Sequence, residues 1–127
     1  MIQIYSNTSD RVLTLSNRRG EFFTAKLGGN PEAAIDVSTY ADEYGLLEFF
    51  RELADFSAPW QEKMAWSSLE EEFKISATSS SLGRVTFAIE FRGLPGGDEE
   101  WSLSAGVSTE FGQLAGFAKA AEKLFLQ

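Results

Sequence analysis

Residues 84–92 contain the feature that most restricts the fold, because apolar and more polar side chains alternate there without interruption. A period of two is typical of a β-strand, since successive side chains of a strand point to opposite faces of its sheet. An antiparallel sheet commonly has one buried and one open face, whereas parallel strands are apolar on both faces. The segment therefore predicts an antiparallel strand. The side chains expected on its buried face are Val85, Phe87, Ile89 and Phe91.

Other segments with strand character lie on both sides of this one. They span residues 1–6, 11–16, 21–27, 33–39, 69–78 and 101–107. Most are separated by short clusters of Gly, Asn, Asp and Ser, which favour turns. Consecutive strands with short connections pair antiparallel, because a parallel return needs about a dozen or more residues.

Two segments have the period of a helix instead. In residues 43–55 and again in residues 111–125, apolar residues recur at spacings of three and four. Asp42 is placed to cap the first helix, and Ser108 or Thr109 to cap the second. The whole pattern predicts an α+β fold, a curved antiparallel sheet of about seven strands with two amphipathic helices packed on one face. We expect a single domain over residues 1–127, because no linker or repeat divides the chain.

The chain contains no cysteine and no histidine. Without cysteine it has no disulfide framework, no thiolate nucleophile and no cysteine-ligated metal. Without histidine it lacks the usual serine triad, the commonest general base and the ligands of most transition-metal sites. We therefore expect a protein that is not an enzyme, with no catalytic residue, no metal and no cofactor.

The net charge is −8, and it is unevenly distributed. Residues 1–30 carry four basic and two acidic side chains, whereas residues 31–127 carry seven basic and seventeen acidic ones. A negative field repels nucleic-acid phosphates and anionic membranes, so we expect neither as a partner. The same field attracts a basic protein partner. The alternative is that the charge serves solubility alone.

The first residues, 1–5, lack a basic segment followed by an apolar stretch, so we expect no signal peptide. No apolar run approaches the ~18 residues of a membrane helix. Together with the absence of cysteine, this favours a cytoplasmic location.

Two loops carry acidic side chains beside aromatic ones, and they supply the candidate contact residues. These residues are Trp60, Glu62, Asp98, Glu99 and Glu100. Tryptophan is a preferred anchor of protein interfaces, although a core position for Trp60 is the competing interpretation. The acidic runs 70–72 and 98–100 lack the interspersed glycines and carbonyl ligands of a metal loop, so we interpret them as solvated charge.

A set of segments in the second half of the chain forms a pattern of its own: Trp60, Trp66-Ser67-Ser68-Leu69-Glu70, residues 73–78, Leu82-Gly83-Arg84-Val85, Trp101 and Glu110-Phe111-Gly112-Gln113-Leu114. Together these segments resemble an uncharacterised bacterial family, the domain-of-unknown-function family 6228. The resemblance covers the chain from about Leu46 onward and concerns mainly the hydrophobic framework. It implies a fold rather than an activity and implies no catalytic residues. The general pattern is also similar to small bacterial immunity proteins of toxin systems.

These observations lead to one main hypothesis and two alternatives. The main hypothesis is a binding protein of the immunity type, which neutralises a basic toxin through its acidic surface. The first alternative is a small-molecule binder with an apolar pocket between sheet and helices. The second is a hydrolase that uses paired carboxylates. The oligomeric state stays open.

Overall fold

The computed structural model describes residues 1–126, and its first half contains a four-stranded antiparallel sheet, sheet A. The strands lie in chain order, each paired with the next. Most of their inward side chains are fully buried, among them Ile2, Leu13, Phe23 and Val37. The bounds of the strands are β1 (Ile2–Tyr5), β2 (Val12–Arg19), β3 (Phe22–Gly28) and β4 (Ala33–Ser38).

The second half contains another four-stranded antiparallel sheet, sheet B, again in chain order. One of its two interior strands carries the alternating segment, and the predicted inward residues Val85, Phe87, Ile89 and Phe91 are buried. The prediction for this strand is therefore confirmed. The bounds are β5 (Met64–Ser67), β6 (Phe73–Ser79), β7 (Arg84–Gly93) and β8 (Trp101–Glu110).

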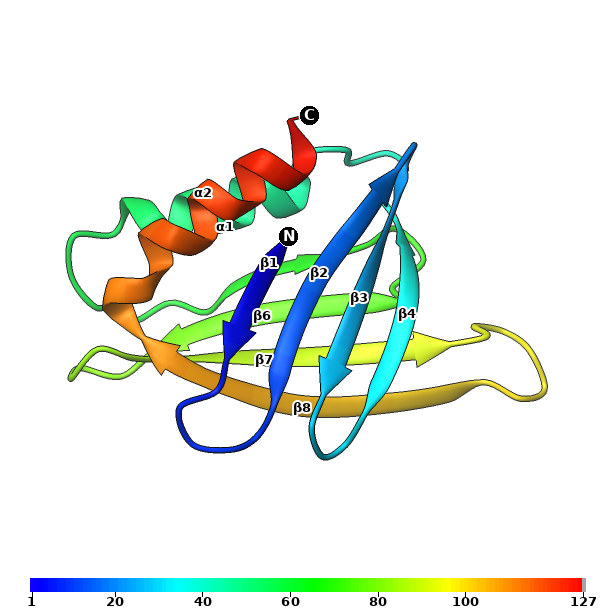
Figure 1. Ribbon diagram of the computed structural model, residues 1–127, viewed down its shortest axis with the longest axis horizontal. Helices are drawn as coiled ribbons and strands as arrows, with labels where there is room; N and C mark the ends of the chain where they lie inside the picture. Colours follow the sequence, from blue (N-terminus) through cyan, green and yellow to red (C-terminus); the bar gives the residue numbers. More distant parts are fainter. Residues whose placement is uncertain (127) are drawn as a thin grey trace.

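Two helices complete the structure, α1 (Gly45–Asp55) and, after a short 3₁₀ turn η1 (Phe111–Gln113), α2 (Leu114–Phe125). The helices pack against each other, α1 also against β5, and α2 also against β1 and β2. They lie together along one side of the two sheets, as Figure 1 shows. Both helices are amphipathic, as predicted, and both direct their apolar stripe to the core.

The strands of sheet A run across those of sheet B (Figure 1), and the buried side chains of the two sheets belong to one hydrophobic cluster. The ring of Phe23 in sheet A lies 6.3 Å from that of Phe73 in sheet B and 5.5 Å from that of Phe125 in α2. Phe87 of sheet B lies 6.2 Å from Phe50 of α1. One core thus joins both sheets and both helices.

The α+β class and the two helices are confirmed, but the prediction of a single curved sheet of about seven strands is wrong. Residues 1–126 contain eight strands in two sheets of four. The segment between β4 and β5 forms α1, so β4 does not pair with β5, and a second sheet begins. Each sheet then covers the apolar face of the other sheet. In the predicted single sheet, the two helices alone would have had to cover that apolar face.

The structure also corrects several local predictions. Residues 64–67, expected in a connector, form β5, and residues 69–72, expected at the start of a strand, lie in the turn before β6. Ser108 and Thr109 lie within β8 and do not cap α2, because the strand continues to Glu110. Asp42 does not cap α1; its carboxylate accepts a hydrogen bond from the indole Nε1 of Trp66 at 3.0 Å.

Candidate functional site

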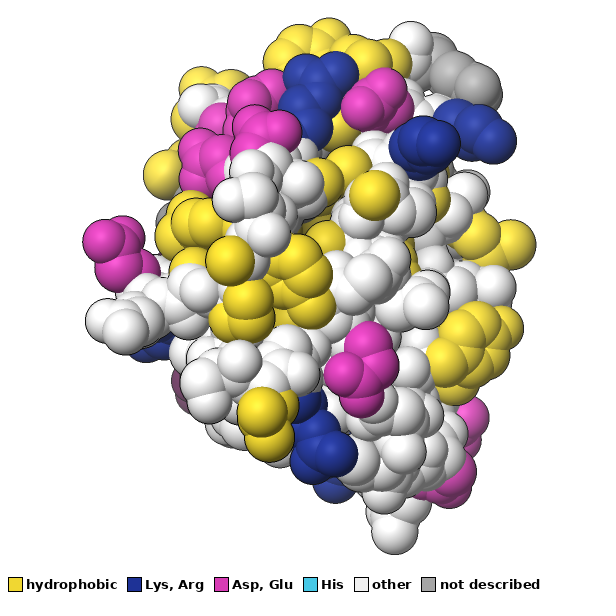
Figure 2. All heavy atoms as spheres, turned by 90° about the vertical axis from the view of Figure 1, so that its left-hand side faces the viewer, with side chains coloured by type: hydrophobic (Ala, Val, Ile, Leu, Met, Phe, Trp, Pro, Cys, Tyr) yellow, Lys and Arg dark blue, Asp and Glu magenta, His cyan; other side chains and the backbone are white. Residues whose placement is uncertain are grey.

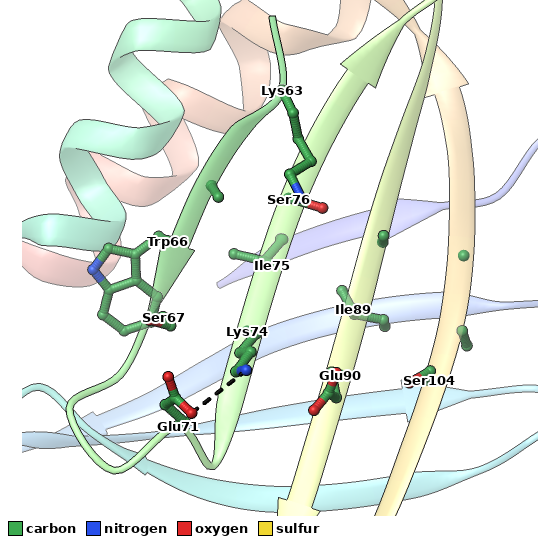
Figure 3. Close-up of a pocket in the computed structure, with 14 residues that line it drawn as sticks. Lys63, Trp66, Ser67, Glu71, Lys74, Ile75, Ser76, Ile89, Glu90 and Ser104 are labelled. Carbon is green, nitrogen blue, oxygen red and sulfur yellow. Dashed lines mark ion pairs between the residues drawn. The ribbon is translucent and has the colours of Figure 1, made fainter.

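The outer face of sheet B, turned away from the core, is hollowed into a groove of about 650 Å³ (Figure 3). Its floor is a row of small side chains that are aligned across all four strands. The register pairs Ala65 with Ser76, Ser76 with Ala88, and Ala88 with Gly106. Small side chains leave the backbone of the sheet close to the surface, which explains the hollow.

The next row of the groove carries charge. Ser67 pairs with Lys74, Lys74 with Glu90, and Glu90 with Ser104. Lys74 turns toward the rim, where its Nζ lies 3.5 Å from a carboxylate oxygen of Glu71, the ion pair drawn in Figure 3. The carboxylate of Glu90 therefore takes part in no ion pair within residues 1–126. It is an available anion in the middle of a face with short side chains.

The two acidic runs of the sequence meet at one end of sheet B, a proximity that the sequence did not indicate. Arg92 joins them. Its Nη2 donates a hydrogen bond to the backbone oxygen of Glu70 at 2.8 Å, and its Nε lies 3.8 Å from the Glu100 carboxylate. The backbone N–H of Arg92 donates to the oxygen of Glu72 at 2.9 Å. We call this region the acidic end, made up of Glu70, Glu71, Asp98, Glu99 and Glu100.

Exposed apolar side chains accompany the acidic end. Leu69 is 58% exposed, Leu94 is 60% exposed, and Trp101 is 38% exposed. The Trp101 indole lies against Gly93, its partner across the strands, where an added Cβ would overlap with it. None of these three residues was a candidate in the sequence analysis. The position of Leu69 and Leu94 beside turn and acidic residues could have indicated that their side chains are exposed.

Asp98, Glu99 and Glu100 lie together in the β7–β8 loop and are exposed. Trp60 and Glu62 lie in the loop between α1 and β5, at the opposite end of the molecule (Figure 1). The five candidate residues therefore do not form one surface.

Trp60 belongs to the core. It is 7% exposed, and its ring stacks on that of Phe56 with 4.8 Å between the centroids. Glu62 nearby is exposed. A smaller hollow of about 390 Å³ lies beside Trp60, lined also by Pro59, Gln61, Ser79 and Ser81. Figure 2 shows this end of the molecule, with acidic, basic and hydrophobic side chains interspersed rather than a field of one sign.

Glu72 is not the solvated charge that the sequence predicted. One of its carboxylate oxygens accepts a hydrogen bond from the hydroxyl of Ser68. The other accepts from the backbone N–H of Ser38 at 3.3 Å. Glu72 thus connects sheet B to the end of β4 in sheet A and stabilises the base of the acidic end.

Within residues 1–126, no group of three or more acidic side chains is arranged to hold a metal ion. In the same part of the chain, no helix is long and apolar enough to cross a membrane.

The model of a family of unknown function, DUF6228, matches residues 4–127. The match confirms the resemblance seen in the sequence and extends it to the N-terminal strands. A search of curated proteins and a search of solved structures found no match.

Proposed function

Since the chain belongs to the family of unknown function DUF6228, we propose its function from its own surface: it is a non-enzymatic protein that binds a basic protein partner through the acidic end. The observation that carries the proposal is the meeting of two acidic runs, together with three exposed apolar side chains, at one end of sheet B.

Hydrogen bonds and an ion pair stabilise the loop that carries most of this charge. The Glu100 carboxylate accepts a hydrogen bond from the N–H of Gly96 at 2.8 Å, and the N–H of Gly97 donates to the oxygen of Leu94 at 3.0 Å. Arg92 holds the base of the loop through its ion pair with Glu100. A loop that is ordered before binding loses less conformational entropy on binding, which supports a recognition role.

The composition of the acidic end also supports a protein partner. Protein interfaces combine aromatic and aliphatic contacts at the centre with a polar rim, and Trp is enriched among the residues that contribute most energy. Trp101, Leu69 and Leu94 supply the apolar contacts. Asp98, Glu99 and Glu100 supply a field that increases the rate of encounter with a cation-rich surface.

The finer form of the proposal is an immunity-type protein that neutralises a basic toxin in the cytoplasm. Inhibition by such a protein requires only that it cover the toxin's active surface, so the absence of histidine and cysteine is compatible with it. A toxin that acts on nucleic acid carries a basic surface to bind phosphates, and the acidic end is complementary to such a surface.

The experiment compares two triple charge reversals that change the net charge equally. The test variant carries Asp98→Lys, Glu99→Lys and Glu100→Lys. The control carries Glu52→Lys, Asp55→Lys and Glu62→Lys, all exposed and at the other end of the molecule. Each protein is used to capture partners from an extract of the organism that encodes the chain. The captured partner is identified, and its affinity is measured at low and high salt.

We expect a basic partner whose affinity falls with salt, falls at least ~10-fold in the test variant and changes little in the control. A partner that is not basic, or one that binds both variants as it binds the original protein, would contradict the proposal.

A second candidate function is small-molecule binding, favoured by the volume of the groove on sheet B. This groove lies on the outer face of the sheet, not between sheet and helices where the sequence predicted a pocket. A thermal-shift screen against a metabolite collection tests it. A stabilising ligand whose effect is lost in Ala88→Phe, which fills the floor of the groove, would favour this candidate.

A further inference from the structure

Strand β8 is an edge of sheet B, because the strand order ends with it. Its backbone therefore presents a row of N–H and C=O groups on the side away from β7. Two contacts identify the residues of that row. The oxygen of Gly106 accepts a hydrogen bond from Arg11 Nη1 at 2.9 Å, and the oxygen of Ser108 accepts one from the N–H of Asn7 at 2.9 Å.

Backbone groups of a strand point to the same side every second residue, so the N–H and C=O of Ser102 and Ser104 also point away from β7. Within residues 1–126, these groups have no hydrogen-bond partner beyond the edge. The edge of β8 therefore has two halves. The segment that connects β1 to β2 covers the second half, from Gly106 onward, and leaves residues 101–105 open.

The open half lacks the usual protection of an edge strand. Proteins prevent unwanted strand pairing by placing proline, lysine or another charge in an edge strand, or by making it short. β8 has ten residues, and neither a proline nor a charged residue occurs between Trp101 and Glu110. An edge of this kind is a ready template for an added strand.

The outer face beside Ser104 favours a basic side chain on the added strand, because Glu90 lies opposite Ser104. A strand added next to β8 would lie two strand spacings, about 10 Å, from β7. The side chains between them on the outer face are those of Ser104 and Gly106, which are too small to block the way. A lysine or arginine on the added strand can therefore reach over β8 to the unpaired carboxylate of Glu90. Figure 3 shows Glu90 and Ser104 side by side in the groove.

We propose that the open half of β8, residues 101–105, accepts an extended basic segment of the partner as a fifth strand of sheet B. A lysine or arginine side chain of that segment, next to Ser104, lies in the groove and pairs with Glu90, and the backbone of the segment pairs with Ser102 and Ser104. The inference rests on the proposed function, whose partner it describes more closely. A second copy of this chain is the wrong occupant, because each copy carries a net charge of −8.

The test uses ¹⁵N-labelled protein and two pools of synthetic peptides of about eight residues, long enough to span the open half of β8. In one pool, Lys or Arg alternates with Val, Ile, Thr or Phe; in the other, Glu replaces the basic residues. We expect the basic pool to shift the amide resonances of Ser102 and Ser104 and to slow their hydrogen exchange at least ~10-fold, because new backbone hydrogen bonds protect them. The acidic pool is expected to leave both amides unchanged.

Two substitutions at one position separate backbone pairing from side-chain contact. Ser104→Pro removes the outward N–H without removing a hydrogen bond to β7, a position that an edge strand tolerates for proline. Ser104→Ala keeps the N–H. We expect Ser104→Pro to weaken binding of the basic pool at least ~10-fold and Ser104→Ala to change it less than ~2-fold. Glu90→Gln should remove most of the preference for the basic pool. The amide protection in the original protein tests the inference even if Ser104→Pro does not fold.

The outcomes distinguish this inference from the proposed function. If the basic pool perturbs only the resonances of residues 94–100, the acidic end binds but strand addition is overturned. If Ser102 and Ser104 are protected and the triple reversal of residues 98–100 leaves partner capture intact, strand addition stands and the proposed function fails. If neither pool protects these amides, the inference is overturned.

Discussion

Gly45 and Gly116 both lie in helices, and replacing each by alanine is expected to change the stability of the protein in opposite directions. Gly116 is an exposed residue of α2, and an added Cβ there would meet no atom within 4 Å. Glycine is less favourable than alanine in a helix by about 0.5–1 kcal/mol. Gly116→Ala should therefore raise the free energy of unfolding by about that amount.

At Gly45, the first residue of α1, an added Cβ would overlap with the Asp42 carboxylate and the indole nitrogen of Trp66. These two groups form the 3.0 Å hydrogen bond that joins the start of α1 to β5. Trp66 packs on Phe73 with 6.4 Å between the rings, so the carboxylate must move and the bond is lost. A hydrogen bond to a charged group contributes about 1.5–3 kcal/mol. Alanine is the better helix former, which offsets part of this loss. Gly45→Ala should therefore lower the free energy of unfolding by about 1–2 kcal/mol.

The measurement is urea unfolding followed by circular dichroism, which avoids the fluorescence of the tryptophan concerned. The two variants should differ by about 2–3 kcal/mol, and the melting temperature of Gly45→Ala should fall by about 4–8 °C. In an Asp42→Ala background, the cost of Gly45→Ala should be smaller, because the hydrogen bond is already absent. Equal stability of the two glycine variants, or full additivity with Asp42→Ala, would refute the assigned role of Gly45.

Two further predictions concern residues whose roles the structure changed. Trp60→Ala should lower the free energy of unfolding by about 3–5 kcal/mol, because it empties a core position. Glu62→Ala in the same loop should change it by less than about 0.5 kcal/mol. If thermal unfolding gave the two variants similar stabilities, Trp60 would be a surface residue. Glu72→Ala should lower the free energy of unfolding by about 1–3 kcal/mol, because it removes the carboxylate that accepts hydrogen bonds from Ser68 and Ser38. Glu70→Ala should change it little, because the backbone oxygen that accepts from Arg92 remains. An equal loss of stability for both variants in chemical denaturation would contradict the bridging role of Glu72.

The alternation of side chains predicted the strands well because it depends on local geometry. Phe22 and Phe23 illustrate this, since neighbouring strand residues must face opposite sides, and the structure exposes the first and buries the second. The short strand at Met64–Ser67 was missed because four residues give too little alternation to recognise. The continuation of β8 through Ser108 and Thr109 was missed because both residue types are also good helix caps.

The candidate site was predicted only in part. Asp98, Glu99 and Glu100 are exposed in one loop, as their turn-rich surroundings indicated. Trp60 was chosen as a contact residue because of its type, yet it packs on Phe56 in the core. No local pattern distinguishes a buried tryptophan from an exposed one. The proximity of residues 70–72 to residues 98–100 depends on the pairing of β6 with β7 and on Arg92, which are contacts between distant parts of the chain.

By itself, the sequence determined most of the segments that are strands or helices, which side of each is apolar, and that histidine and cysteine chemistry is absent. These properties depend on single residues and on the repeat along a few neighbours. The tertiary structure decided that the strands divide into two sheets, and that, among residues 1–126, nothing pairs with the outer edge of half of β8 or with the Glu90 carboxylate beside it. Such features follow from the free energy of packing the whole core, in which residues far apart along the chain contribute together, so a local pattern cannot specify them.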